Sequence, residues 1–205
     1  PLENVKNVTD WAREIGYTSI SHDLIFGLPF QTLEKVKNTI AITNDLKPDR
    51  IAFYSYAHVP WIKGNGQRGF NEANLPSAGL KRAQYELGKE LLADVGYDEI
   101  GMDHFALKSD SLHESMVEGK LHRNFMGYTA SKTQAMIGLG VSSISDSWYG
   151  FAQNVKSIED YYKHLEDDLI PVYRGHILSK EDLIIRKHIL NLMCQFKTSW
   201  SSNQL

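Results

Sequence analysis

The first quarter of the chain alternates between segments with helical and with strand-like spacing of apolar residues. Residues 5–15 place their apolar side chains on one stripe, which predicts a helix. Residues 18–26 are short, apolar and β-branched except for Asp23, a pattern typical of a strand covered on both faces. Thr32 is expected to cap a second helix, and residues 50–56 to form the next strand. The pattern therefore predicts two parallel strands joined by a helix.

The remainder of the chain predicts further helices and strands separated by loops. Residues 61–76 are rich in glycine and asparagine and predict a long connection. Ser77 is expected to begin a helix whose apolar stripe contains Leu80, Ala83, Leu87, Leu91 and Val95. The other expected elements are strands at residues 97–102 and 138–145 and helices at residues 112–118 and 158–165. Ser179 and Asp182 have the spacing of a capping box at the start of the last helix, for which the sequence indicates no packing partner.

Asp23 lies near the end of a predicted buried strand, where a charged side chain needs a reason. One reason is local, since short polar residues often cap the following turn. The other is functional, because ligands of α/β proteins gather at the carboxyl ends of parallel strands. Gly27 and Pro29 would then bend the chain away and leave room beside the acid. By the same logic Ala57 and Ile144, also near strand ends, are expected to lie close to Asp23 at one edge of the sheet.

Length and composition limit the classes of protein that fit. With 205 residues, 42% of them hydrophobic, the chain can bury a core in one or two domains. A net charge of -3, a pI near 6.3 and the lack of a basic run argue against a nucleic-acid partner. The sequence contains neither a membrane-spanning apolar run nor a signal-peptide pattern, so a cytoplasmic protein is expected. The start within a helical pattern, without methionine, suggests a fragment whose uncovered apolar face would promote self-association.

The cysteine and histidine content predicts no metal site within this chain. Cys194 is the single cysteine, so neither an internal disulfide nor a multi-cysteine site can form, and a buried apolar role is expected for it. His58, His104, His122 and Arg123 do not have the spacing of a ligand set. His122 and Arg123 are neighbours, so their side chains diverge on any regular element.

Five sequence blocks stand out together. They are residues 23–29 (DLIFGLP), 56–60 (YAHVP), 100–105 (IGMDHF), 121–129 (LHRNFMGYT) and 140–145 (GVSSIS). In this order they resemble the oxygen-independent coproporphyrinogen III oxidases, which are radical S-adenosylmethionine enzymes of haem synthesis, and the resemblance covers residues 17 to about 196. The block at 121–129 is the most specific, because the haem-chaperone branch of the superfamily lacks it.

The resemblance implies an α/β fold with the later part of a partial (βα) barrel. Residues 1–170 would form the C-terminal part of the radical S-adenosylmethionine catalytic domain, and residues 171–205 would begin a helical C-terminal domain. The implied reaction is the oxidative decarboxylation of two propionates of coproporphyrinogen III to the vinyl groups of protoporphyrinogen IX. The implied cofactors are S-adenosylmethionine and a [4Fe-4S] cluster, while the electron donor and acceptor cannot be identified from the sequence.

The resemblance also assigns roles to individual residues. Asp23 matches an acid near the ribose hydroxyls of S-adenosylmethionine, Ala57 a backbone contact to the adenine, and Ile144 a residue that flanks the adenine. The implied substrate carries four carboxylates, and arginine is well suited to a planar carboxylate. Arg123 is therefore the first candidate for substrate binding, followed by His122 and His58, although all could instead bond local backbone.

The chain departs from the family in a way that limits what it can do alone. The C-x3-C-x2-C loop that holds the family's cluster is absent, and so is the glycine-rich strand near the methionine end of the cofactor. The chain is thus expected to be the later half of the catalytic domain and inactive by itself. Two alternatives remain open: a haem-binding chaperone of the same superfamily, and a (βα) barrel enzyme of unrelated chemistry.

Overall fold

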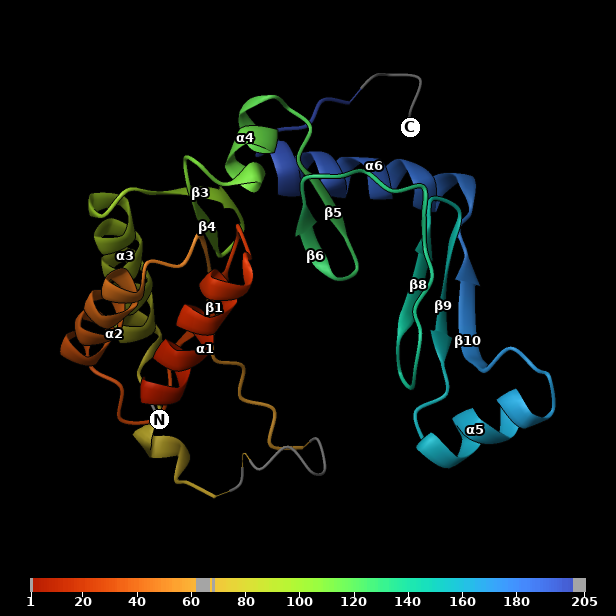
Figure 1. Ribbon diagram of the computed structural model, residues 1–205, viewed down its shortest axis with the longest axis horizontal. Coiled ribbons are helices and arrows are strands. Elements are labelled where there is room, and N and C mark those ends of the chain that lie inside the picture. The colour runs from red at the N-terminus through yellow and green to blue at the C-terminus, as the bar shows by residue number, and fades with distance from the viewer. Residues whose placement is uncertain (1, 62–66, 68, 201–205) are drawn as a thin grey trace. The chain divides into compact units, whose positions relative to one another are not determined.

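The structure is a computed structural model that describes residues 2–61, 67 and 69–200 (Figure 1). It divides into two compact units, Pro1–Glu114 and Ser115–Leu205, each with its own sheet. The first unit contains α1 (Leu2–Ile15), β1 (Ser21–Phe26), α2 (Leu33–Leu46), β2 (Arg50–Ser55), the short 3-10 helix η1 (Glu72–Asn74), α3 (Ala78–Asp94), β3 (Tyr97–Gly101) and β4 (His104–Leu107). α4 (Ser111–Val117) begins in the first unit. None of the helices in the described residues is long and apolar enough to cross a membrane.

The sheet of the first unit combines one parallel and two antiparallel pairs. Its order is β1-β2-β4-β3. β1 and β2 pair in parallel, and helix α2 connects them in the chain. This confirms the predicted strand, helix and strand, with Thr32 as the cap of α2. The segment after β3 differs from the prediction, because the chain turns at Asp103 with a φ of 58° and returns as β4, antiparallel to both β2 and β3. His104 and Phe105 therefore lie within a strand and not in a loop beyond one.

Helices α2 and α3 pack together and cover one face of this sheet (Figure 1). The core between helices and sheet is built from Phe26, Val36, Ile40, Ile51, Phe53, Leu92, Tyr97 and Phe105. The prediction that β1 is covered on both faces is wrong for the described residues, because Asp23 and Ile25 are exposed while Phe26 is buried. The apolar stripe of α1 is exposed as well, with Trp11 58% accessible. Self-association of the chain stays a prediction.

The buried face of α3 is not the one that the apolar pattern predicts. Gln84, Gly88 and Leu92 are its buried residues, whereas Ala83 and Val95 of the predicted stripe are exposed. The helix begins after Ser77, whose hydroxyl accepts a hydrogen bond from Leu80 N as expected for a cap. The helix is therefore present where the sequence predicts it, but it is rotated about its axis.

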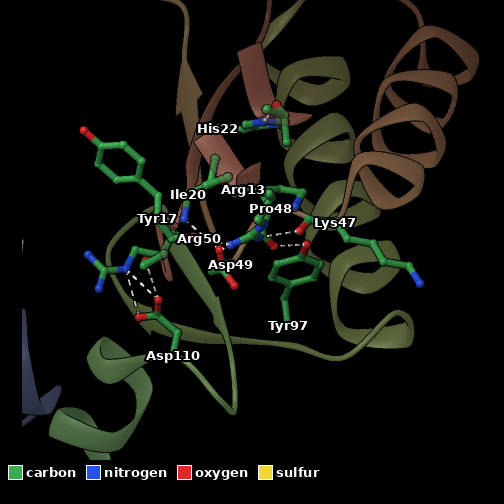
Figure 2. Close-up of polar contacts among 12 residues, drawn as sticks. Arg13, Tyr17, Ile20, His22, Lys47, Pro48, Asp49, Arg50, Tyr97 and Asp110 are labelled. Atoms are coloured by element: carbon green, nitrogen blue, oxygen red, sulfur yellow. Dashed lines mark hydrogen bonds and ion pairs between the residues drawn. The ribbon is translucent and has the colours of Figure 1, made fainter. Parts of the chain in front are cut away.

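A polar network fixes the amino-terminal ends of β1 and β2 (Figure 2). The guanidinium of Arg13 lies 2.6 Å from a carboxylate oxygen of Asp49, and the same oxygen accepts a 2.7 Å hydrogen bond from Ile20 N. Arg50 Nε donates to both carboxylate oxygens of Asp110, at 2.8 and 2.9 Å. These contacts lie at the edge of the sheet opposite the carboxyl ends of the parallel strands, so they position the strands without occupying the end where a ligand is expected.

The second unit is built from antiparallel strands and two helices. Its elements are β5 (His122–Asn124), β6 (Gly127–Thr129), β7 (Ala135–Met136), β8 (Ile144–Ser147), β9 (Gly150–Asn154), α5 (Ile158–Glu166), β10 (Val172–Ile177) and α6 (Lys180–Gln195). β5 and β6 form a hairpin, and the other four strands form a sheet of order β10-β9-β8-β7. The predicted strand at residues 138–145 is wrong, because Gly140, with a φ of 90°, lies in a loop and β8 begins only at Ile144.

Helix α6 begins with the predicted capping box of Ser179 and Asp182. The expectation that it lacks a partner is wrong, because it packs against β5 and bonds to β8. Arg186 donates to Asp146 at 2.7 Å, and Tyr128 donates its hydroxyl hydrogen to Met193 O at 2.8 Å. The boundary between the two units falls between residues 114 and 115. The domain boundary expected at residue 170 stays a prediction.

Candidate functional site

Asp23 lies in the middle of β1, on the face of the sheet that α2 and α3 leave uncovered. Its side chain is exposed, and its register partner on β2 is Ala52, which in turn pairs with His104 on β4. Residues in register share a face, so Asp23, Ala52 and His104 form one row across three strands. The acid is therefore three residues before the strand end, and not at the turn that a purely local capping role would require.

Tyr54 and His104 form a hydrogen-bonded pair on the same face. His104 Nδ1 is 2.7 Å from the carbonyl oxygen of Met102, which can only accept, so Nδ1 carries the hydrogen. In the neutral ring Nε2 is then an acceptor, and Tyr54 donates its hydroxyl hydrogen to it over 3.2 Å. The open face of the sheet thus presents a carboxylate and an oriented phenol–imidazole pair. Sequence reasoning missed Tyr54, since alternation in a strand does not reveal which strand lies beside it.

Two side chains of α3 hold the backbone where β1 and β2 end. Gln84, which is fully buried, accepts a hydrogen bond from Gly27 N at 3.1 Å and donates one to Gln31 O at 2.7 Å. Lys81 Nζ donates to Tyr56 O at 2.7 Å. The turn after β1 and the segment after β2 are therefore both fixed by one helix, which places the ends of the two parallel strands relative to each other.

Ala57 and His58 follow β2 in a segment with its own internal contacts. The carbonyl of Ala57 accepts a 3.0 Å hydrogen bond from the side-chain amide, Nε2, of Gln67. A carbonyl has two lone pairs, so this bond leaves acceptor capacity for a second donor. His58 Nε2 lies 3.0 Å from Glu72 Oε1, and its ring is 5.4 Å from that of Phe70. The described contacts of His58 are therefore local, as the alternative interpretation of this residue expected.

His122 and Arg123 point to different cavities of the second unit, in keeping with their adjacent positions on β5. His122 lines a cavity of about 790 Å³, whereas Arg123 lines one of about 360 Å³ whose walls are mostly apolar. Burial lowers the pKa of His122 from its usual 6.5, and the positive charges of Lys132 and Arg186 lower it further. His122 is therefore a neutral side chain at pH 7 in a positive environment.

Arg123 is a strong candidate for holding an anion. Its guanidinium lies over the ring of Tyr128, 4.6 Å from the centroid, and its Nη1 is buried with no hydrogen-bond partner in the structure. An unpaired donor of this kind is costly, which favours an additional acceptor in the functional protein. The same charge opposes the rise that burial causes in the pKa of Cys194. Cys194 itself is buried, as expected.

Ile144 is the first residue of β8, where it pairs with Gln153. It belongs to the second unit, whereas Asp23 and Ala57 belong to the first, so the proximity of the three residues stays a prediction. β8 is antiparallel to both of its neighbours, which removes the original reason for expecting Ile144 at the carboxyl edge of a parallel sheet.

The side chains present fit one of the two expected cofactors better than the other. Asp23 offers two exposed acceptor oxygens on an open sheet face, which suits a pair of neighbouring ribose hydroxyls. A [4Fe-4S] cluster needs several thiolates, and Cys194 is the single cysteine of the sequence. Among the described residues no three histidine, cysteine or acidic side chains gather in a way that could hold a metal ion.

Comparison with known proteins identifies relatives along nearly the whole chain, although no family model matches. The chain is 42% identical to the oxygen-independent coproporphyrinogen III oxidase of Synechocystis, over 94% of this chain and 41% of that protein. It is 40% identical to the Escherichia coli enzyme of the same name, over 93% of this chain and 41% of that protein. The solved structure of coproporphyrinogen III oxidase from Escherichia coli, described as a radical SAM enzyme, matches with a TM-score of 0.90 and 40% identity.

That structural match covers 96% of this chain and 45% of the solved chain. The chain thus spans less than half the length of the relatives that it matches. Its sequence is homologous to a segment of oxygen-independent coproporphyrinogen III oxidases, which confirms the resemblance, and its mixed α/β fold is that of the matched radical SAM enzyme.

Proposed function

We propose that this chain is part of an oxygen-independent coproporphyrinogen III oxidase and forms the later half of its catalytic domain. The proposal is carried by the homology over nearly the whole chain, at identities of 36 to 42% with relatives of that name. In the proposed reaction each of two substrate propionates becomes a vinyl group by losing CO₂, one proton and two electrons. Bound S-adenosylmethionine, together with a [4Fe-4S] cluster held by cysteines outside this sequence, would supply the radical chemistry.

The role of the first unit in this function is to hold and orient the adenosyl part of the cofactor. Asp23 would accept hydrogen bonds from the ribose hydroxyls, and the backbone of Ala57 would contact the adenine. Ile144, in the second unit, would flank the adenine. Gln84 and Lys81 would keep the two strand ends in register, which matters because small errors in orientation cost rate as well as affinity.

The role of the second unit is to neutralise the acid groups of the substrate. Arg123 would bind one carboxylate through its buried, unpaired Nη1 and the neighbouring nitrogen. His122 would serve a second carboxylate as a neutral hydrogen-bond donor, because its pKa is lowered by burial and by nearby cations. His58 is the weakest of the three candidates, since its described partners are Glu72 and Tyr56.

The proposal is tested by replacing Asp23 with asparagine in the longer protein that carries this chain. Asparagine keeps the shape but removes the charge, and charge-assisted hydrogen bonds are about twice as strong as neutral ones. We expect S-adenosylmethionine to bind about 1.5 to 3 kcal/mol more weakly, roughly ten- to a hundredfold. Iron content should be unchanged, because the cluster ligands lie elsewhere.

The matched control is Asp45→Asn, which removes an exposed carboxylate from α2 in the same unit. Equilibrium dialysis with S-adenosylmethionine, iron analysis and chromatography of the porphyrin product are measured for both variants and the parent protein. Equal affinities for Asp23→Asn and the parent would remove Asp23 from the cofactor site. A parent protein that binds haem and leaves coproporphyrinogen III unchanged would favour the haem-chaperone alternative.

A further inference from the structure

A cavity of the second unit has the size of a ligand site. Its volume is about 790 Å³, within the range of about 300 to 1,000 Å³ typical of small-molecule pockets. Its walls come from β5, the loop before β7, β7 itself, β8 with the turn after it, and α6. The lining side chains used below are His122, Lys132, Asp146, Trp148 and Arg186.

The charged side chains of this cavity leave an excess of positive charge. Asp146 is the single acid among the lining residues, and its buried carboxylate accepts a 2.7 Å hydrogen bond from Arg186. Lys132 is exposed, and no carboxylate of the described residues lies within ion-pair distance of it. Since Asp146 and Arg186 balance each other, the charge of Lys132 is left uncompensated, with His122 as a polar neighbour. The cavity therefore favours an anion.

The cavity also contains a rigid aromatic wall. Arg186 donates to Ser147 O at 2.6 Å and to Trp148 O at 3.2 Å, which fixes its guanidinium 5.2 Å from the centroid of the Trp148 ring. Lys132 Nζ lies 5.9 Å from the same ring. Two cations near one indole lie within the range of cation–π contacts and hold the ring in place. The indole thus gives the cavity an apolar wall beside the lysine.

We propose that this cavity binds a carboxylate arm of a multiply acidic ligand, with Lys132 as the charge partner, His122 as a hydrogen-bond donor and Trp148 as an apolar wall beside the lysine. The identification of that ligand as a tetrapyrrole rests on the proposed function. Arg123 opens onto a different cavity, so the arm held here is not the one that Arg123 would hold. His122 and Arg123, neighbours on β5 that line different cavities, would thereby hold two different acid groups of one ligand.

The test compares Lys132→Met with Lys163→Met in the longer protein that carries this chain. Methionine keeps the length of the lysine stem and removes its charge, and Lys163 lies on the exposed surface of α5 away from the cavity. The probes are coproporphyrin III, the oxidised form of the substrate in the proposed reaction, which carries the same four carboxylates, and benzene-1,3,5-tricarboxylate, which is smaller. Dissociation constants are measured by fluorescence and by calorimetry at low and moderate ionic strength.

We expect Lys132→Met to weaken the binding of both probes about threefold to fivefold at low ionic strength, as for a partly exposed charge pair, and Lys163→Met to leave it unchanged. His122→Gln, which keeps a hydrogen-bond donor, should retain most of the affinity, and His122→Leu should lose it. His122 is half-buried on β5, so the folding of the two His122 variants is checked by unfolding curves.

The outcomes separate this proposal from the function on which it rests. Binding of both probes that does not respond to Lys132→Met overturns the cavity as an acid-arm site, even if the protein decarboxylates coproporphyrinogen III. Binding of the tricarboxylate that depends on Lys132, in a protein that neither binds coproporphyrin III nor converts coproporphyrinogen III, supports the cavity and overturns the proposed function. An equal loss in Lys132→Met and Lys163→Met indicates general charge attraction and overturns the site.

Discussion

Replacing Gly88 with alanine should destabilise the first unit, although the same change elsewhere in α3 should stabilise it. Gly88 is buried in the face of α3 that packs on the sheet. A Cβ atom at this position would lie 2.6 Å from Cζ of Phe53 and closer still to Cε1. Phe53 is 2% exposed and lies 4.7 Å from the ring of Phe26, centroid to centroid, so its ring has little room to move. The added methyl group must therefore displace the core or the helix.

The expected size of the effect follows from two opposing terms. Alanine in a helix interior is favoured over glycine by about 0.5 to 1 kcal/mol. Overpacking a well-filled core costs about 1 to 3 kcal/mol. The net destabilisation of Gly88→Ala should be about 1 to 2 kcal/mol. Gly79, in the same helix, has no atom within 4 Å of its ideal Cβ position, so Gly79→Ala should gain a few tenths of a kcal/mol.

The measurement is equilibrium unfolding in urea, monitored by circular dichroism, of the parent protein and the two alanine variants. The difference between the variants should be about 2 kcal/mol, most of it from the overpacking at Gly88. A Gly88→Ala variant as stable as Gly79→Ala would refute the packing of α3 against Phe53. It would also remove the basis for the strand positions at the proposed cofactor site.

Two further predictions concern the polar groups that support the units. Asp110→Asn should destabilise the first unit by about 2 to 3 kcal/mol in urea unfolding. The reason is that Arg50, whose side chain is 27% exposed, loses the carboxylate that pairs with it. The control is Asp94→Asn, which changes an exposed residue and should have little effect. The free energy of unfolding should also fall as the pH drops below about 6.5. Burial lowers the pKa of His22 and His122 below that value in the folded protein, so the unfolded chain binds protons at a higher pH than the folded one does. Urea midpoints between pH 7.5 and 5 measure this fall, and a pH-independent midpoint would contradict it.

Local sequence signals predict the helices and three strands of the first unit, but neither the partners of the strands nor most strands of the second unit. Thr32, Ser77 and Ser179 all cap helices as expected, because a cap depends on backbone groups three residues away. The strand spacing at residues 97–102 is also right, yet the reversal at Asp103 was missed. A positive φ at a non-glycine residue leaves no trace in apolar periodicity, so a hairpin was taken for the end of a strand.

Residues of the candidate site could be predicted only where a single segment of the sequence marks them. Asp23 was found because a lone carboxylate interrupts an apolar strand, and Arg123 because arginine suits a planar carboxylate and lies in the block at residues 121–129. Lys132, Trp148 and Arg186 were missed, because the cavity that they line brings together four segments between residues 122 and 186. Their spacing in the sequence does not indicate that these segments meet, so only the fold reveals the excess of positive charge.

Helix α3 explains why apolar periodicity can misplace a face that matters for function. Lys81, Gln84 and Gly88 follow one another at helical spacing, and each contacts a part of β1 or β2 or the turn after it. Where a parallel sheet ends, its last backbone groups lose their ladder partners and must find others. Polar and small side chains meet this need, whereas leucine would leave the amide of Gly27 unpaired. The helix thus turns a stripe with polar and small side chains toward the sheet, because the strand ends that carry the site require hydrogen bonds as well as burial.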